Sequence, residues 1–173
     1  MNIRGPAPPN MPDPNPHTPR LGFVGIPGTA LAAALALRAL GRPVTVCCED
    51  ESLSDVASPT EVAHHADVVF LEASDPDGVD AILFAVTGLA SGAPTPRIDP
   101  DTGDAEPGLV VVVFTPLDDD AVAAATERLA GYGIALAHAP LDPRTQRLAD
   151  LTADEALLPV LVSILMDANL LDD

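Results

Sequence analysis

Short apolar runs alternate with helix-length segments along most of this chain. Segments with helical patterns cover about 28–41, 59–66, 76–86 and 118–131. Between and around them lie the runs LGFVG (21–25), PVTVCC (43–48), DVVFLE (67–72), GLVVVVF (108–114) and IALAHA (134–139). Unbroken apolar runs are typical of strands buried on both faces, and strands that alternate with helices need crossover connections. The pattern predicts an α/β fold with a doubly wound, mainly parallel sheet of five or more strands.

The same pattern divides the chain into three regions. Residues 1–19 contain seven prolines, a density that favours extended, unpacked chain, so we expect a disordered tail. A recognition segment for a partner is the alternative. Residues 20–152 form one predicted domain, interrupted at 91–108 by a Pro-, Gly- and Asp-rich exposed loop that is either a functional insertion or a tolerated one.

The last region, 153–173, contains a predicted helix over 154–171 with two apolar stripes. A helix that is apolar on two faces does not suit an exposed surface, and Pro159 fits its first turn. One stripe would pack on the sheet and the other could bind a second subunit, which predicts a homodimer. Packing within its own domain is the alternative. The stripes are formed by residues 157, 161, 164, 168 and 171 and by residues 158, 162 and 165.

The charge of the chain narrows the classes of partner. Its 26 acidic residues against eight arginines give a formal charge of −18, and lysine is absent. Such a surface repels polyanions, so neither nucleic acid nor an anionic membrane is an expected partner. A generally acidic proteome would give the same charge without a functional meaning.

Composition indicates the kind of core and the cellular compartment that we expect. Aromatic residues make up 3% of the chain, so its core must consist of aliphatic side chains. The adjacent Cys47 and Cys48 are too close for an ordinary structural disulfide and indicate a reducing compartment. The N-terminus has no apolar stretch of signal-peptide length before Leu21, and no run of about 18 apolar residues occurs, so we expect a cytoplasmic protein.

A glycine-containing turn lies between the first predicted strand and helix. It reads Gly-Ile-Pro-Gly-Thr-Ala over 25–30, after GFV and before LAAALALRALG. This strand, turn and helix resemble a Rossmann-like NAD(P)-binding domain, specifically the N-terminal cofactor domain of the β-hydroxyacid dehydrogenases, which include 3-hydroxyisobutyrate and 6-phosphogluconate dehydrogenases. Three further segments are similar to that family in the same order, so the resemblance covers 20 to about 143. They are SPTEVAHHADVVFLEASDPDGVDAIL, PGLVVVVFTPLDDDAV and GIALAHAPLD.

The resemblance implies a dinucleotide site, from which this sequence departs. The pyrophosphate would meet the turn, where Pro27 lacks the N–H and places a ring. After the second strand, Glu49 or Asp50 could bind the ribose hydroxyls of NAD, whereas the acids disfavour the 2′-phosphate of NADP. We therefore expect no cofactor, with NAD as the alternative. The turn residues concerned are Gly25, Ile26, Pro27, Gly28 and Thr29.

The family's substrate residues are also altered. Its Ser-Thr pair matches Thr115 and Pro116, and its Asp-Ala-Pro-Val-Ser-Gly-Gly run matches 138–144, where the glycines are missing and Asp142 replaces the serine. The family's acid/base lysine belongs to a second, helical domain, and this sequence has neither. We therefore do not expect self-sufficient hydroxyacid oxidation.

The carboxyl ends of the predicted strands form an acidic rim, which suits a cation, an amine or a basic protein surface. His138, Asp142 and Thr115 are the side chains there that could converge for acid/base chemistry, although a structural role for His138 is an alternative. His64 and His65 point to different helix faces, so no metal site is expected.

Three hypotheses of function follow. The first is a degenerate Rossmann-like protein acting as a non-redox accessory or partner subunit. The second is an enzyme with repurposed, non-redox chemistry at the rim. The third is an NAD-binding subunit completed by another chain. The fold alone does not choose among them.

Overall fold

Five short apolar strands form the central sheet of the protein, as a computed structural model describes it for residues 18–171. All five are five residues long. Four of them are largely buried, which explains their runs of Val, Leu, Ala and Phe, and the strand at 44–48 is mostly half-buried. Most of the predicted tail lies outside the described residues. The strands are β1 (Leu21–Gly25), β2 (Val44–Cys48), β3 (Val68–Glu72), β6 (Leu109–Val113) and β7 (Ile134–His138).

The sheet has the order β2-β1-β3-β6-β7, and every pairing is parallel. The strand order reverses at β1, so the connections after β1 and β3 leave the sheet in opposite directions. In open α/β sheets this switch point, outside the carboxyl ends of the strands, is where ligands bind. The predicted parallel sheet is confirmed.

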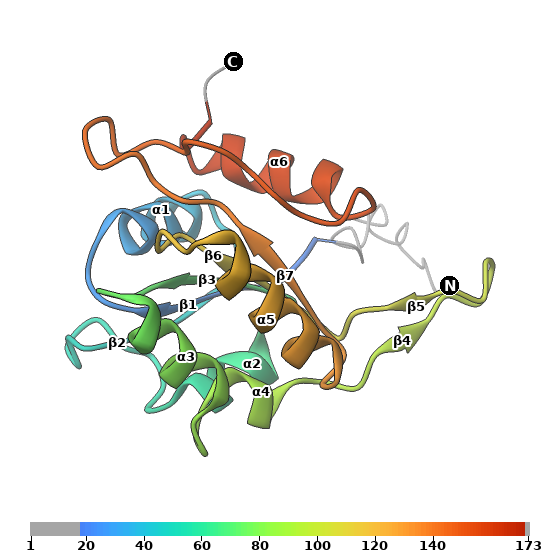
Figure 1. Cartoon of the computed structure of the whole chain (residues 1–173). Helices are drawn as coiled ribbons and strands as arrows, with labels where there is room; N and C mark the ends of the chain where they lie inside the picture. Colours follow the sequence, from blue (N-terminus) through green and yellow to red (C-terminus); the bar gives the residue numbers. More distant parts are fainter. Residues whose placement is uncertain (1–17, 172–173) are drawn as a thin grey trace, which may run out of the picture.

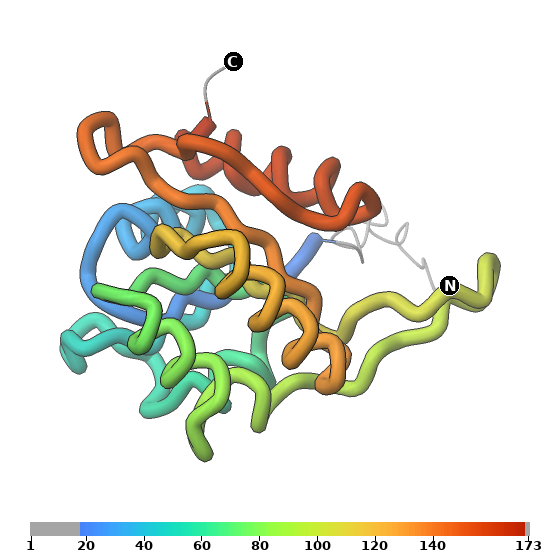
Figure 2. Tube along the Cα trace, in the orientation of Figure 1, coloured from blue at the N-terminus to red at the C-terminus, as the bar shows by residue number. Residues whose placement is uncertain are grey.

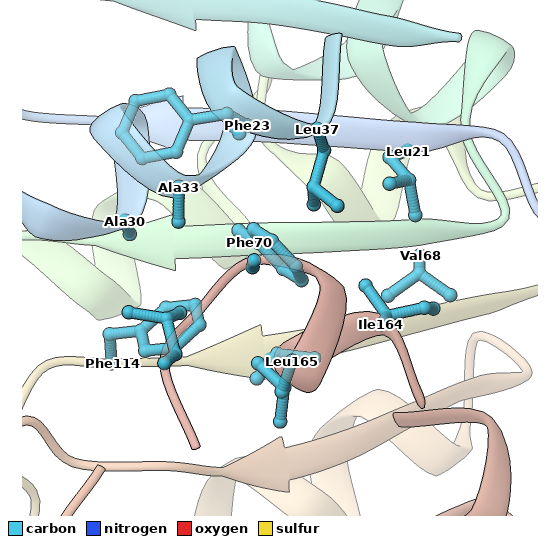
Figure 3. Close-up of a cluster of buried hydrophobic side chains, with 14 of the residues drawn as sticks. Leu21, Phe23, Ala30, Ala33, Leu37, Val68, Phe70, Phe114, Ile164 and Leu165 are labelled. Atoms are coloured by element: carbon cyan, nitrogen blue, oxygen red, sulfur yellow. The ribbon is translucent and has the colours of Figure 1, made fainter. Parts of the chain in front are cut away.

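Helices cover both faces of the sheet (Figure 1). One face packs against α1 (Thr29–Ala39) and α6 (Leu158–Asp167), through a cluster that includes Phe70 and Phe114 in edge-to-face contact (Figure 3). The opposite face packs against the remaining helices, which the tube trace also places together (Figure 2). These are α2 (Pro59–His65), α3 (Pro76–Phe84), α4 (Leu89–Gly92) and α5 (Asp119–Ala130).

Three helices begin with a side-chain cap, and α1 does not. Ser58, Asp75 and Asp118 each accept a hydrogen bond from the backbone N–H three residues ahead. The residue in the same position of α1 is Gly28, which has no side chain to offer. The first N–H groups of α1 therefore need acceptors from elsewhere in the protein.

Two predicted segments differ from the structure. The region 91–108 is not entirely loop, because it contains the end of α4 and a hairpin of β4 (Arg97–Ile98) and β5 (Ala105–Glu106). The C-terminal helix is shorter than 154–171, since Pro159 lies in its first turn and the chain leaves the helix near Asn169, which has φ 58°.

Helix α6 turns most of its apolar surface inward. Leu161, Ile164 and Leu165 are buried against the sheet. Two members of the second predicted stripe, residues 158 and 162, are half-buried. The large apolar side chains of α6 that remain exposed are Val160 and Met166, whose exposed fractions are 49% and 46%. No helix within residues 18–171 combines the length and the apolar character that crossing a bilayer requires.

Candidate functional site

The turn between β1 and α1 lies at the switch point of the sheet and is held tightly against β3. The Ile26 N–H donates to the Glu72 carbonyl at 2.9 Å. Gly25 has φ 137°, and a Cβ atom at this position would lie 1.8 Å from the same carbonyl oxygen. Gly25 is therefore required by the contact of two strands, whether or not a ligand binds.

The side chain of Glu72 occupies the N-terminus of α1. Its Oε2 atom accepts a hydrogen bond from the Ala30 N–H at 2.9 Å. A Cβ atom at Gly28 would lie 2.6 to 2.8 Å from the carboxylate, so the missing side chain of Gly28 makes room for it. A helix N-terminus attracts anions through its free N–H groups and its dipole, and here the anion comes from the protein itself.

A second contact binds the first turn of α1. The Thr29 hydroxyl donates to Oε1 of Gln146, which belongs to the loop after β7. Gln146 has φ 57°, a left-handed conformation that is uncommon for residues other than glycine, and its N–H donates to the Asp142 carbonyl at 2.8 Å. The first turn of α1 is thus bound by two segments that are distant in sequence.

A pocket of about 450 Å³ remains beside this turn, over the carboxyl ends of β1, β2 and β3. Its lining is mainly apolar, with Glu49 at the end of β2 and Asp75 at the start of α3. Asp50 does not line it. The Asp50 carboxylate accepts hydrogen bonds from the Ser52 N–H and hydroxyl, which lower its pKa. Of the two acids proposed for the ribose, Glu49 is the one that faces the pocket.

The two cysteines are half-buried thiols at the end of β2, and both line this pocket. Burial raises the pKa of the Cys47 thiol, and the neighbouring Cys48 and Glu61 raise it further. Cys47 is thus kept in its protonated, poorly nucleophilic form at neutral pH.

The three proposed acid/base residues lie at adjacent strand ends, but their polar groups are bound separately. The Thr115 hydroxyl lies 2.8 Å from the Ala73 nitrogen and 3.1 Å from the Ala73 oxygen. Nε2 of His138, a residue 9% exposed, is 3.1 Å from the Thr115 carbonyl and 3.3 Å from the Leu117 nitrogen. His138 therefore contacts the backbone of Thr115, not its hydroxyl.

The Asp142 carboxylate closes its own turn. Its Oδ1 atom accepts hydrogen bonds from the Arg144 and Thr145 N–H groups at 2.6 and 3.2 Å. His64 and His65 are exposed on α2. Within residues 18–171, no group of three or more His, Cys, Asp or Glu side chains is arranged to hold a metal ion.

Sequence reasoning placed Glu72 on the acidic rim but not at the N-terminus of the first helix, and it missed Gln146. A signal for Glu72 was present, because it is the acidic last residue of an otherwise apolar strand, DVVFLE. Parallel strands end at the same edge of the sheet, so this carboxylate had to lie near the turn after β1. Gln146 carries no comparable signal, because its position depends on the path of a long loop.

Comparison with known proteins gives a fold and no closer relationship. No protein-family model matches the chain, and neither does any curated protein. Mycobacterium tuberculosis 3-hydroxyisobutyrate dehydrogenase is similar in structure, with a TM-score of 0.67 and 15% identity over 87% of this chain and 52% of that one. An imine reductase from Myxococcus stipitatus, in complex with NAD+, has a TM-score of 0.66 and 14% identity over 87% and 52%.

A Streptomyces aurantiacus imine reductase gives a TM-score of 0.63 and 17% identity over 86% of this chain and 53% of that one. The chain spans about half the length of each of these proteins. The predicted resemblance is thus confirmed at the level of fold: this chain has the Rossmann-like fold that it shares with about half of each of these proteins.

Proposed function

We propose that this protein uses a dinucleotide-binding fold without a dinucleotide, as a non-redox accessory or partner subunit. The observation that carries the proposal is the Glu72 carboxylate, bound to the Ala30 N–H at 2.9 Å. In this fold the pyrophosphate lies on the N-terminus of the first helix and uses the same kind of N–H group. A ligand phosphate would have to displace a negative charge that belongs to the protein.

The electrostatic cost of sharing the site is large. Two unit charges about 4 Å apart repel by about 4 kcal/mol at an effective dielectric constant of about 20. Pro27 further weakens phosphate binding because it has no N–H to donate to a phosphate. Glu49 in the adjacent pocket would in addition repel the 2′-phosphate of NADP.

Isothermal titration calorimetry with NADH and NADPH tests the proposal. The unmodified protein is expected to bind neither at millimolar concentration, and micromolar NADH binding would refute the proposal. Glu72→Gln removes the charge but keeps the shape, so NADH affinity should rise at least about tenfold if the carboxylate is the barrier. Glu51→Gln is the matched control, because Glu51 is an exposed acid outside this pocket.

An accessory role requires a partner, and a second copy bound through α6 is the partner that we propose. Val160 and Met166 are the large apolar side chains of this helix that remain exposed. If it is an interface, Met166→Glu should shift the molar mass in light scattering from dimer to monomer, whereas Ala123→Glu on the exposed face of α5 should not. A monomeric unmodified protein would contradict the interface, and the acidic rim would then favour a basic protein partner or a cationic small molecule.

One observation favours the third hypothesis, an NAD-binding subunit completed by another chain. The pocket beside the turn is open, and Glu49 lies where an acid would accept the ribose hydroxyls. Binding would then require Glu72 to leave Ala30, so NADH should bind the unmodified protein and Glu72→Gln should bind it more tightly. Repurposed catalysis by His138, Thr115 and Asp142 has less support, since their polar groups are bound within the domain.

A further inference from the structure

The two edge strands of the sheet are protected to different extents. At β2, the Val46 N–H donates to the Asp55 carboxylate and the Val46 carbonyl accepts from the Asp55 N–H, both at 2.8 Å. Next along this strand, the Cys48 N–H donates to the Ser54 hydroxyl at 2.9 Å. The loop after β2 therefore satisfies the outer edge of β2.

At β7, a single residue pair satisfies the backbone groups of the outer edge. His138 exchanges two hydrogen bonds of 2.8 Å with Thr152, an antiparallel bridge. Alternate residues of a strand direct their N–H and C=O groups to the same edge, so Leu136 and Ile134 share the outer edge with His138. Within residues 18–171, no hydrogen bond satisfies the outward backbone groups of these two residues.

The open half of this edge forms one wall of a groove of about 660 Å³. The groove is lined by Ile134 and Leu136, by Pro96 and Pro107 beside the β4–β5 hairpin, and by residues just before α6. Most of the lining is apolar, and the exposed acids Glu106 and Asp154 also line it. Its shape and chemistry suit an extended segment that carries apolar side chains and a positive charge.

We propose that residues 1–5 of this chain, Met-Asn-Ile-Arg-Gly, bind along β7 as an additional strand. These residues lie outside the described range, and the proposal rests on their sequence. Met1 and Ile3 alternate with Asn2 and Arg4, so one face of a strand would be apolar and the other polar. Arg4 matches the acids of the groove, and the added strand ends before Pro6, which cannot donate a ladder hydrogen bond.

The connection to the domain allows this docking in the same molecule. Arg20 is fixed to the base of β3, where its N–H donates to the Asp67 carboxylate at 2.9 Å. From β3 to β7 there are two strand spacings, about 10 Å in total. Residues 6–17 reach up to about 37 Å when extended at about 3.1 Å per residue. The tether is long enough, and it keeps the segment at a high effective concentration.

Amide hydrogen exchange of the full chain, followed by NMR, tests the docking. The Leu136 amide should exchange slowly in the unmodified protein and about tenfold faster in Ile3→Asp, because a charge replaces the apolar side chain. Asn2→Gln changes a side chain on the polar face without adding a charge that the acids of the groove would repel, and it should leave Leu136 protected. The Ala135 amide, which faces β6, should be unchanged throughout and reports on intact folding.

Two results would overturn the proposal. Equal exchange of Leu136 in the unmodified protein and in Ile3→Asp would show that residues 1–5 do not cover the edge. Protection of Leu136 that grows with protein concentration would identify a second copy as the occupant. The measurement does not involve dinucleotides, so it is independent of the proposed function.

Discussion

Replacing Gly25 with alanine is the sharpest test of the site's geometry. Gly25 would be the first glycine of a dinucleotide fingerprint, yet in this protein its backbone lies against β3. The substitution would force a side chain into φ 137° and place Cβ 1.8 Å from the Glu72 carbonyl oxygen. Both effects act on the protein without any ligand.

The magnitude follows from the two contributions. A backbone conformation reserved for glycine costs an alanine about 1–3 kcal/mol. Relieving the overlap requires β1 and β3 to separate locally, at the typical overpacking cost of about 1–3 kcal/mol. Gly25→Ala should therefore lower the free energy of unfolding by about 2–6 kcal/mol, a large part of the stability of an ordinary domain.

Gly41→Ala is the matched control. Gly41 has φ 86°, and a Cβ atom there would have no neighbour within 4 Å, so only the backbone conformation destabilises this variant. Its expected cost is about 1 kcal/mol. Urea unfolding followed by circular dichroism measures both variants. If the two lost stability equally, the close contact of β1 with β3 would be refuted as the reason for a glycine at position 25.

Three further predictions concern other parts of the protein. Thr115→Val should lower the free energy of unfolding by about 1–2 kcal/mol in urea titrations, because it removes the hydroxyl bound to the Ala73 backbone. Burial tends to raise the pKa of Asp67, but hydrogen bonds from Arg20 outweigh this and lower it. The contribution of Asp67 to the free energy of unfolding should thus be complete above pH 3.8 and should fall as the pH drops through the lowered pKa. In Asp67→Asn, the free energy of unfolding should depend less on pH in this acidic range. Since burial raises the pKa of Cys47, iodoacetamide should alkylate this thiol more slowly at pH 8 in the folded protein than in urea, as peptide mass spectrometry can measure.

Local pattern determines most of the fold. The valine run at 110–113 is typical of a strand buried on both faces, and the structure places it in β6, a fully buried interior strand between β3 and β7. Ser58 and Asp118 precede their helices as N-caps, and Pro59 and Pro159 lie in first turns. These signals act over a few residues, so a sequence displays them directly.

The parts that pattern did not predict depend on distant contacts. The hairpin within 91–108 consists of two-residue strands, which are too short to give a period. The path of the loop after β7 decides that Gln146 reaches Thr29 and that Asp142 binds its own turn. The hydrogen-bond partners of these side chains depend on the path of the loop, so the sequence alone does not predict them.

The turn after β1 best separates what the sequence determines from what the tertiary structure determines. By itself, the sequence determined that a strand, a glycine turn and a helix occur at residues 21–39, because apolar periodicity and turn chemistry are local properties. Only the tertiary structure decided what fills the turn. It brings Glu72, 42 residues from Ala30 in sequence, to the N-terminus of α1, because β1 and β3 are neighbours in a parallel sheet and end at the same edge.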